Sequence, residues 1–550
     1  MFTSLCVVPL KDCEIKYFDF SFLSLLKLLF FYCFNPAQRT AVFGFTRLSV
    51  MSSLRTVRMR QLRVAVVGAG AAGLCAARHI LSRPDTFAPP VVYELAEHVG
   101  GTWFYEERTG SYDNGLSIHS SMYRNLRTNL PKEVMMFPDF PFDPQLPSFL
   151  PHQEVQKYLE RYCQSHCITP HIRFSTVVDE VSPVVTEGKG PMTTWEVTSR
   201  DKSGSRNTET FDSVFICSGH YSDPHIPSIP GLERFKGKVI HSHSYRHPEP
   251  FSGQSVVVLG AGASGLDISL ELGRSNAQVT LSHGKPTLPF PLPYGVHQAT
   301  PVEEIQEDGS LRFQDGSITQ AQVLLLCTGY NFSYPFLEPA RLGLEVQEHL
   351  VTPLYRFLMP PAFPSLFIIG ICKIICPFPH FHCQVRLMVM LIILFFVEQN
   401  VWLPHPSLTI SCSFSLLLLF CSFPSFSLSI NLSLSLFPSF SQVQFALAVL
   451  EGSVALPSQA EMEEEAQGEM ARKVERGVQL RHMLKMDKEQ WGYAQTLAQT
   501  GRFAPLPPVT QSLYEEVWRQ RQVHPQNYRQ LNYRLVSDTQ WEQQELHAGE

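Results

Sequence analysis

Two short apolar runs are each followed at once by a glycine-rich turn and then by an apolar-periodic stretch. The first run is 62–67, followed after its turn by 74–83, and the second is 255–259, followed after its turn by 266–274. A continuous apolar run bounded by turn signals is typical of a strand buried in a parallel sheet, and a periodic stretch after it predicts a helix. The pattern therefore predicts an α/β chain that contains two strand–turn–helix units.

Both turns have the spacing G-x-G-x-x-G. The first turn consists of Gly68, Ala69, Gly70, Ala71, Ala72 and Gly73, and the second consists of Gly260, Ala261, Gly262, Ala263, Ser264 and Gly265. In such a unit the first glycine makes the turn, the second lets the backbone approach a pyrophosphate, and the third lets the helix pack on the strand. Two complete units predict two dinucleotide sites, whereas one such motif alone could be a structural turn.

The residues after the next strand of each unit differ, and the difference indicates two different cofactors. The apolar run ending at Tyr93 is followed by Glu94, where an acid can bind ribose hydroxyls. The corresponding run of the second unit ends at Ser282 and is followed by His283 and Lys285 with no acid. Ser282 and Lys285 are therefore candidates for the 2′-phosphate of NADPH, which we favour over NADH. The alternative is that Lys285 is a solvated loop charge.

Composition narrows the function further. The 550 residues include 44 Lys and Arg against 50 Asp and Glu, a net charge of −6, and 44% are hydrophobic, which argues against a disordered chain or a nucleic-acid binder. None of the 13 cysteines forms a C-x-x-C pair. A chain that holds a flavin and binds NADPH without a redox cysteine pair must pass electrons from flavin directly to oxygen or to an organic acceptor.

Four further segments resemble the flavin-containing monooxygenases, in particular the glucosinolate S-oxygenase-like branch. Residues 235–245 match the fingerprint F-x-G-x-x-x-H-x-x-x-Y just ahead of the second turn, and 99–103 (VGGTW) resemble the flavin-contacting loop. Residues 130–142 resemble the segment M-x-F-P-D-F-P-F, and 327–330 (CTGY) resemble a strand end of the family. The resemblance covers about 63–370 and resumes at 445.

The resemblance implies an enzyme that uses FAD, NADPH and O2 to transfer one oxygen atom to a small-molecule soft nucleophile, a thioether sulfur or an amine nitrogen, through a flavin 4a-hydroperoxide. It places Gly101, Thr102 and Trp103 against the flavin and makes Asn129 the catalytic candidate near flavin and nicotinamide. The alternative for Asn129 is an Asx turn before a proline. A Baeyer–Villiger monooxygenase, which usually carries Trp at the position of Tyr245, and an impaired isoform that only binds nucleotide are the competing functions.

The expected architecture is two Rossmann-type domains, with an NADPH domain inserted into a larger FAD domain. The FAD domain is expected to consist of three separate segments, 59–222, 331–384 and 443–550, the last of which includes a C-terminal tail. The NADPH domain is expected at 223–330, an N-terminal extension at 1–58 and an insertion at 385–442. The oligomeric state is left open.

The insertion is the unusual segment of the chain. From 411 to 441, 27 of 31 residues are Phe, Ser, Leu or Pro, and none is charged. The codons of these residues are those of a pyrimidine-rich tract, and residues 385–386 and 441–442 can be encoded by splice-site sequences. We therefore interpret 385–442 as a translated intron whose removal joins Gln384 to Val443. The alternative is a natural low-complexity loop, which would be unusually long for a compact domain.

Two apolar stretches bear on localisation. The stretch 18–34 is interrupted by Lys27 and preceded by acids, unlike a signal peptide, and 387–397 is shorter than the ~20 residues of a spanning helix. We therefore expect a cytoplasmic protein with no membrane span and no nucleic-acid partner. Membrane association is the alternative if these segments are functional.

Overall fold

The computed structural model describes residues 60–112, 116–185, 193–286, 292–398 and 457–544, with the side chains of helix α7 described up to 392. The stretch 18–34, the splice-like junction at 441–442 and the tract 411–441 lie outside the described residues. Residues 62–550 belong to one compact unit, which contains all the elements below.

The first sheet contains the first glycine-rich unit. Its five strands lie in the order β20 (Leu366–Ile368), β7 (Ser213–Ile216), β1 (Val64–Val67), β2 (Val91–Tyr93) and β3 (Ile172–Arg173), and all neighbours are parallel. β1 is buried at every position, as the continuous apolar run predicts for a strand covered on both faces. Helix α3 (Ala71–Leu81) leaves the turn after β1 and packs on the sheet.

The second sheet repeats this arrangement around the second unit. Its five strands lie in the order β12 (His297–Ala299), β11 (Gln278–Ser282), β10 (Ser255–Leu259), β16 (Val323–Leu326) and β9 (Lys238–His241), again all parallel. Helix α6 (Ala263–Arg274) follows β10 across the second turn. The two parallel sheets confirm the predicted pair of Rossmann-type domains.

The chain leaves the first sheet, builds the second, and then returns to the first. Strand β7 ends at Ile216, all strands of the second sheet lie between 238 and 326, and β20 then pairs beside β7. The second domain is therefore inserted into the first, as expected. Strand β8 (Asp223–Pro224) pairs antiparallel with β17 (Tyr330–Asn331), so the two connections between the domains are hydrogen-bonded to each other.

Smaller sheets and helices surround this core. The small sheets are β4–β5–β6 (Val177–Val185, Thr193–Arg200, Arg206–Phe211), β13–β14–β15 (Val302–Ile305, Leu311–Phe313, Ile318–Thr319), β18–β19 (Glu345–Val346, Val351–Thr352) and β21–β22 (Asn532–Leu535, Trp541–Gln544). The remaining α-helices among the described residues are α4 (Lys132–Met135), α5 (His152–Ser165), α7 (Pro377–Glu398), α11 (Gln459–Glu475), α12 (Glu489–Thr500) and α13 (Pro508–Val523). No described helix is long and apolar enough to span a bilayer.

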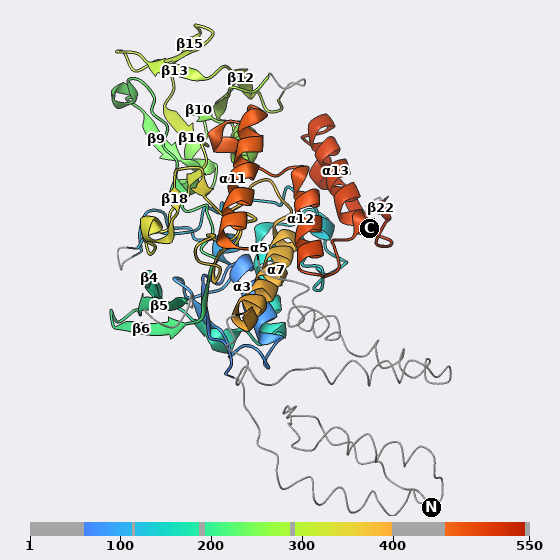
Figure 1. Ribbon diagram of the computed structural model, residues 1–550. Coiled ribbons are helices and arrows are strands. Elements are labelled where there is room, and N and C mark those ends of the chain that lie inside the picture. The colour runs from blue at the N-terminus through green and yellow to red at the C-terminus, as the bar shows by residue number, and fades with distance from the viewer. Residues whose placement is uncertain (1–59, 113–115, 186–192, 287–291, 399–456, 545–550) are drawn as a thin grey trace, which may run out of the picture. The chain divides into compact units, whose positions relative to one another are not determined.

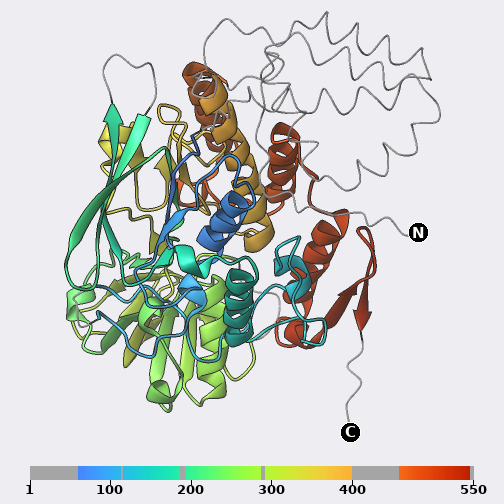
Figure 2. The same ribbon diagram turned by 90° about the horizontal axis from the view of Figure 1, so that it is seen from below.

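Helix α7 lies beside α3 and crosses the predicted splice junction without a break (Figures 1 and 2). On the insertion side, Val385 and the residues 387–392 are all buried in the core of the first domain. Arg386 is half-buried, with its guanidinium 4.7 Å from the Phe503 ring centroid. The first residues of the insertion thus complete a buried helix rather than forming a loop.

The sequence after the insertion has the same pattern, which leads to a prediction. Residues 443–450 (VQFALAVL) have the same pattern as 385–392 (VRLMVMLI): in each stretch the second residue is polar and the other seven are apolar. We expect a chain that joins Gln384 to Val443 to bury these residues along α3 and to be soluble and flavin-bound. The full chain should aggregate or partition to membranes because its tract 411–441 carries no charge. Gel filtration and flavin content of both chains measure this.

A control for the joined chain shifts the helical register. Removing Val443 as well rotates the following apolar face by about 100° relative to α3, because an α-helix has about 3.6 residues per turn. That variant should lose solubility and flavin. An active full-length chain beside an inactive joined chain would contradict the intron interpretation.

Candidate cofactor-binding and active site

The first turn requires glycine at two of its positions, Gly68 and Gly73. Gly68 has φ +103°, and a Cβ there would lie 2.6 Å from the carbonyl oxygen of Cys217 at the end of β7. A Cβ on Gly73 would lie 1.8 Å from the carbonyl oxygen of Gly68. Both values are below any real Cβ contact, so β1, its turn and α3 approach each other closely because these side chains are absent.

The second turn has the same geometry. Gly260 has φ +102°, and a Cβ there would lie 2.6 Å from the carbonyl oxygen of Cys327 at the end of β16. A Cβ on Gly265 would lie 1.7 Å from the carbonyl oxygen of Gly260. The equal geometry of the two turns agrees with two dinucleotide sites rather than one site and one structural turn.

The middle glycines leave the helix N-termini open. Gly70 and Gly262 are the N-caps of α3 and α6, neither helix has a side-chain cap, and neither has an acid in its first turn. A Cβ on Gly262 would meet nothing within 4 Å, and one on Gly70 would meet only the backbone of Gly101, at 3.6 Å or more. Unpaired N–H groups beside open space fit the pyrophosphate of a dinucleotide.

Glu94 lies at the carboxyl end of β2, beside the first turn. Its carboxylate accepts hydrogen bonds from the backbone N–H of Ala69 at 2.6 Å and of Ala96 at 2.9 Å. Burial raises the pKa of Glu94, and the backbone hydrogen bonds oppose that rise. Glu94 thus fixes the turn, and the structure brings it to the place where a ribose-binding acid is expected.

The predicted flavin-contacting loop packs on the first turn. It forms the 3-10 helix η2 (Gly101–Trp103), and the N–H of Gly100 donates to the carbonyl of Ala69 at 3.0 Å. Trp103 is half-buried, with its ring edge-on to Phe378 of α7 at a centroid distance of 6.3 Å. The Thr102 hydroxyl lies 3.4 Å from that of Ser121. The predicted loop therefore begins beside the N-terminus of α3, where Gly101 lies next to Gly70.

Lys285 reaches the second turn, while Ser282 is engaged elsewhere. The Lys285 ammonium donates to the carbonyl of Ala261 at 2.7 Å, so it is not a free loop charge. Burial and the nearby Arg521 of α13 lower the pKa of Lys285. The Ser282 side chain is buried, and its hydroxyl donates to the carbonyl of Thr300 at 2.8 Å. A phosphate contact by Ser282 would require that hydroxyl to exchange its partner.

The fingerprint residues attach the link between the domains to the second sheet. A Cβ on Gly237 would lie 2.3 Å from the carbonyl oxygen of Gln322, so the chain can enter β9 only with glycine there. His241 accepts from the N–H of His243 at Nδ1 (3.0 Å), and its Nε2 lies 3.0 Å from the carbonyl oxygen of Gly329. Burial lowers the pKa of His241 to about 4, so the ring is neutral at physiological pH. These contacts favour a packing role for His241.

The last residue of the fingerprint is also fixed by a hydrogen bond. Tyr245 is fully buried, and its hydroxyl donates to Glu271 of α6 at 2.7 Å. The neighbouring Tyr123 hydroxyl donates to Asp267 of the same helix. These two tyrosines hold the connecting segments against the helix that carries the second turn.

Arg246 directly follows the fingerprint, yet its role was not predicted from the sequence. Its guanidinium is buried and donates to five carbonyl oxygens at 2.6–3.1 Å, those of Glu106, Arg108, Ser120, His243 and Tyr245. Three of these carbonyls belong to the first domain and two to the link into the second. The side chain thus ties the two domains together. A basic residue next to the fingerprint was the available signal.

A short segment that follows a strand in both domains was not recognised as a repeat from the sequence. Residues 217–220 (CSGH) follow β7 and repeat the pattern of 327–330 (CTGY), which follow β16. Gly219 and Gly329 both have positive φ, +75° and +91°. The carbonyl oxygens of Cys217 and Cys327 are the atoms that would clash with a side chain at the first glycine of each turn. Comparison of the two segments within the sequence would have identified both as belonging to the nucleotide sites.

Asn129 lies on a segment that runs between the domains. It is half-buried, and the structure shows no hydrogen bond to its amide from any described residue. The N–H of its neighbour Thr128 donates to the carbonyl of Leu150, and the Thr128 hydroxyl accepts from the N–H of Leu150. The Thr128 carbonyl accepts from the Arg529 guanidinium at 3.1 Å. Arg529 is also paired with Asp267 of α6. The amide of Asn129 is therefore available on a well-fixed backbone.

Comparison with known proteins agrees with this geometry. The family model for flavin-binding monooxygenase-like proteins matches residues 61–290. Flavin-containing monooxygenase FMO GS-OX-like 4 of Arabidopsis thaliana is 39% identical over 347 residues, which cover 59% of this chain and 75% of that protein. FMO GS-OX4 of the same plant is 39% identical over 326 residues, covering 56% of this chain and 68% of that protein.

Two solved structures are similar along nearly their whole length. The S-allyl-L-cysteine S-oxygenase of Allium sativum is 30% identical with a TM-score of 0.68, and the match covers 86% of this chain and 96% of the other. Tmm from a Pelagibacter strain is 25% identical with a TM-score of 0.67, covering 88% and 97%.

The similarities and the two open turns together establish the kind of enzyme. It is a monooxygenase with FAD and NADPH as cofactors, and it uses O2 to oxygenate sulfur or nitrogen in a small molecule. The residues at both turns fit these cofactors. The chain belongs to the flavin-containing monooxygenases, in the FMO GS-OX-like branch.

Proposed function

We propose that this monooxygenase acts on thioether sulfur in preference to amine nitrogen, with small sulfides of the S-alkyl cysteine type as substrates. The supporting observation is the likeness to the garlic S-allyl-L-cysteine S-oxygenase, which extends over 96% of that chain. The FMO GS-OX names of the plant relatives point in the same direction. When bound, FAD reduced by NADPH supplies the activated oxygen, and the protein supplies binding, orientation and exclusion of water.

The first turn and its neighbours would hold FAD. The open N-terminus of α3 at Gly70 would bind the pyrophosphate, and Glu94, which already fixes the turn, would bind the ribose hydroxyls. The loop Gly101–Trp103 lies against the same turn and would bind flavin. The buried core between α3 and α7 lies behind this turn and would exclude water from that side.

The second turn would hold NADPH. The N–H groups at the start of α6, beside Gly262, would bind its pyrophosphate, and Lys285 would bind the 2′-phosphate. Burial is the main cause of the lowered pKa values of Lys285 and Lys485, and neighbouring positive charges lower them further, Arg521 at Lys285 and Lys285 with Arg481 at Lys485. Several positive charges gathered near Lys285 favour an anionic ligand there.

Asn129 would act at the oxygen-transfer step. An amide can donate a hydrogen bond to a developing negative charge on oxygen without exchanging a proton, so no acid–base pair is required. Its free amide and the anchored backbone on either side suit that role. Arg246 and Tyr245 would set the distance between the two cofactors by holding the domains in place.

The first prediction here concerns the substrate. We expect the flavin-loaded enzyme to convert an S-alkyl cysteine to its sulfoxide with a kcat/KM at least about tenfold above that for a tertiary amine of similar size, a difference of about 1.4 kcal/mol in transition-state binding. Product analysis by mass spectrometry with NADPH and air measures this. A cyclic ketone serves as a third substrate, and lactone as the main product would instead favour a Baeyer–Villiger enzyme.

A second prediction separates the two turns. Gly70→Val should abolish flavin retention, because its methyl groups enter the space left for the pyrophosphate. Lys285→Ala should leave FAD bound and weaken NADPH by about tenfold to over a hundredfold, since a charge-assisted contact is worth ~1.5–3 kcal/mol, with little change for NADH. Flavin absorbance and the KM values for both nucleotides measure these effects.

Each variant has a matched control. Lys236 is an exposed lysine of the same domain, and Lys236→Ala should change neither nucleotide. Equal losses of NADPH and NADH in Lys285→Ala would remove Lys285 from the 2′-phosphate site. A Gly70→Val protein that purifies as yellow as the parent would show that the first turn is misassigned.

A third prediction concerns Asn129. Asn129→Ala should keep FAD and oxidise NADPH, while sulfoxide formation falls and hydrogen peroxide appears in its place. The ratio of sulfoxide to NADPH consumed measures the coupling. Asn125 on the same segment has an amide that donates to Glu271 at 2.7 Å, so Asn125→Ala tests a structural loss and should remain coupled. Full coupling in Asn129→Ala would exclude it from the mechanism.

A further inference from the structure

Lys373 is a half-buried lysine whose charge no described acid balances. Its ammonium nitrogen lies 4.6 Å from the centroid of the Phe332 ring, and no carboxylate among the described residues pairs with it. Burial, together with the charge of Lys485, lowers the pKa of Lys373 to about 8. Removing a charged group from water is costly unless an opposite charge accompanies it. An anion bound at Lys373 would supply that charge.

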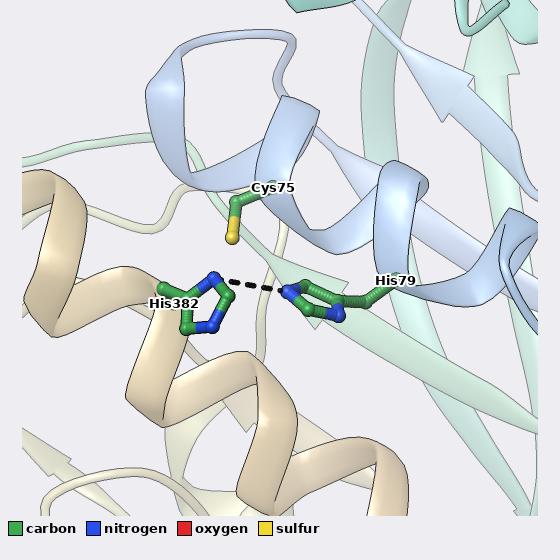
Figure 3. A group of neighbouring side chains, drawn as sticks. All are labelled: Cys75, His79 and His382. Atoms are coloured by element: carbon green, nitrogen blue, oxygen red, sulfur yellow. Dashed lines mark hydrogen bonds between the residues drawn. The ribbon is translucent and has the colours of Figure 1, made fainter. Parts of the chain in front are cut away.

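Buried polar groups elsewhere in the first domain pair with one another. Between α3 and α7, His79 Nε2 lies 3.3 Å from His382 Nδ1 (Figure 3). The Arg78 guanidinium contacts both ring nitrogens of His79 and is itself paired with Asp139. That cluster therefore contains its own counter-charge, whereas Lys373 has none among the described residues.

The residue opposite Lys373 is a second lysine. The N–H of Lys373 donates to the carbonyl of Leu484 at 2.7 Å, and the N–H of Met486 donates to the carbonyl of Lys373 at 2.9 Å. This pairing places Lys485 directly across from Lys373, and Lys485 has no acid partner among the described residues either. Like charges directly opposite each other are destabilising. An anion bound between the two lysines would replace this repulsion by attraction.

The backbone next to Lys373 is strained. Ile374 has φ +57° and is 39% exposed. A β-branched residue rarely adopts this left-handed conformation, and such strain gathers at ligand sites. The N–H of Asp487 donates to the carbonyl of Ile374 at 3.0 Å, which holds the strained residue in place. The strain thus adds an independent sign of function to the two unbalanced charges.

Lys373 lies where the two nucleotide domains meet. It follows β20 at the carboxyl edge of the first sheet, and only β7 separates β20 from β1. The segments after β7 and β16 contact each other there. The rings of His220 and Phe332 are 5.6 Å apart, and those of Tyr221 and Tyr330 are 5.5 Å apart. Ligands of α/β sheets bind at this edge, so Lys373 is placed for a substrate that reaches the flavin.

A pocket of about 420 Å³ opens near the two lysines. Its lining consists of Gln347, Glu348, His349, Gln479, Leu480 and Arg481. Burial lowers the pKa of His349, and nearby positive charges, that of Lys373 among them, lower it further. The acid of the lining, Glu348, is turned toward His225, with 3.5 Å between Oε2 and Nδ1. The pocket has the volume that a small molecule needs.

We propose that Lys373 and Lys485 bind the carboxylate of the sulfide substrate and thereby select S-alkyl amino acids over sulfides without a carboxylate. The proposal rests on the thioether oxygenation proposed above. A carboxylate can accept hydrogen bonds from both ammonium groups, and such charge-assisted bonds are stronger than neutral ones. The competing anion is a phosphate of NADPH, because Lys285 contributes, after burial, to the lowered pKa of Lys485.

The first test compares two sulfides that differ only in the carboxylate. With the flavin-loaded full-length chain, kept in mild detergent if it associates, S-allyl cysteine should have a kcat/KM at least about tenfold above that of S-allyl cysteamine. Lys373→Met removes the charge but keeps a side chain of similar length beside Phe332, and it should lower this ratio about tenfold. The exposed Lys488 is a matched control, since Lys488→Met should keep the ratio. A ratio that Lys373→Met leaves unchanged would overturn the proposal.

The pH dependence gives a second readout. Lys373 is charged below about pH 8 and loses its charge above it, so the KM for S-allyl cysteine should rise by up to about tenfold per pH unit beyond that point. S-allyl cysteamine has the same amine and corrects for its titration. Lys485 is the other charge facing Lys373. Burial lowers the pKa of His220 to about 3 and also lowers that of His349, so both imidazoles are neutral in this range.

The conservative variant tests the origin of that rise. Lys373→Arg keeps its charge to higher pH, so it should reduce the rise in KM severalfold. A rise that Lys373→Arg leaves unchanged would contradict the role of Lys373. An increase in the KM for NADPH that is equal with both sulfides in Lys373→Met would assign the lysines to a cofactor phosphate and would also overturn the proposal.

A binding measurement does not depend on turnover. Calorimetric titration of the oxidised, flavin-loaded chain should give a Kd for S-allyl cysteine at least about tenfold below that for S-allyl cysteamine. Equal Kd values in the unaltered chain would overturn the proposal even if sulfides are oxygenated. Carboxylate-dependent binding that Lys373→Met abolishes, in a chain that forms no sulfoxide, would instead contradict the proposed function and support the anion site.

Discussion

Both nucleotide turns depend on backbone atoms that approach more closely than any side chain permits. At the first turn the carbonyl oxygen of Cys217 lies too close to Gly68 for any Cβ there. At the second turn the carbonyl oxygen of Cys327 lies too close to Gly260 in the same way. Each turn is also hydrogen-bonded to the neighbouring strand in the same way. The N–H of Gly68 donates to the carbonyl of Tyr93 at 2.8 Å, and the N–H of Gly260 donates to the carbonyl of Ser282 at 2.9 Å. This close packing brings each helix N-terminus to the carboxyl end of its sheet, which is where dinucleotides bind in folds of this kind.

A second group of contacts fastens the two domains to each other. The fingerprint ahead of the second turn contributes to it through packing rather than through acid–base chemistry. His241 and Tyr245 hold the link to the second domain, and the buried Arg246 donates to carbonyls of both domains. A guanidinium suits this task because its donors are fixed in one plane and its charge persists when it is buried.

Much of this could be predicted because it depends on local sequence. The glycines of both turns, Glu94 and Lys285 could be named as candidates from spacing alone, because each follows a strand within its own unit, and the structure places each of them at its turn. Arg246 and Arg529 were not found, because their partners are far apart in the chain. Helix α7 was missed for a different reason, as the start of the insertion has by itself the apolar pattern of the helix that it interrupts.

The central claim is that one oxygen atom from O2 is transferred to sulfur at the expense of NADPH. It is tested most directly by single-turnover oxidation of a thioether under isotopically labelled dioxygen in unlabelled water. We predict one labelled oxygen in each sulfoxide and one NADPH consumed per product. Unlabelled sulfoxide, or NADPH oxidation that yields only hydrogen peroxide, would contradict this claim.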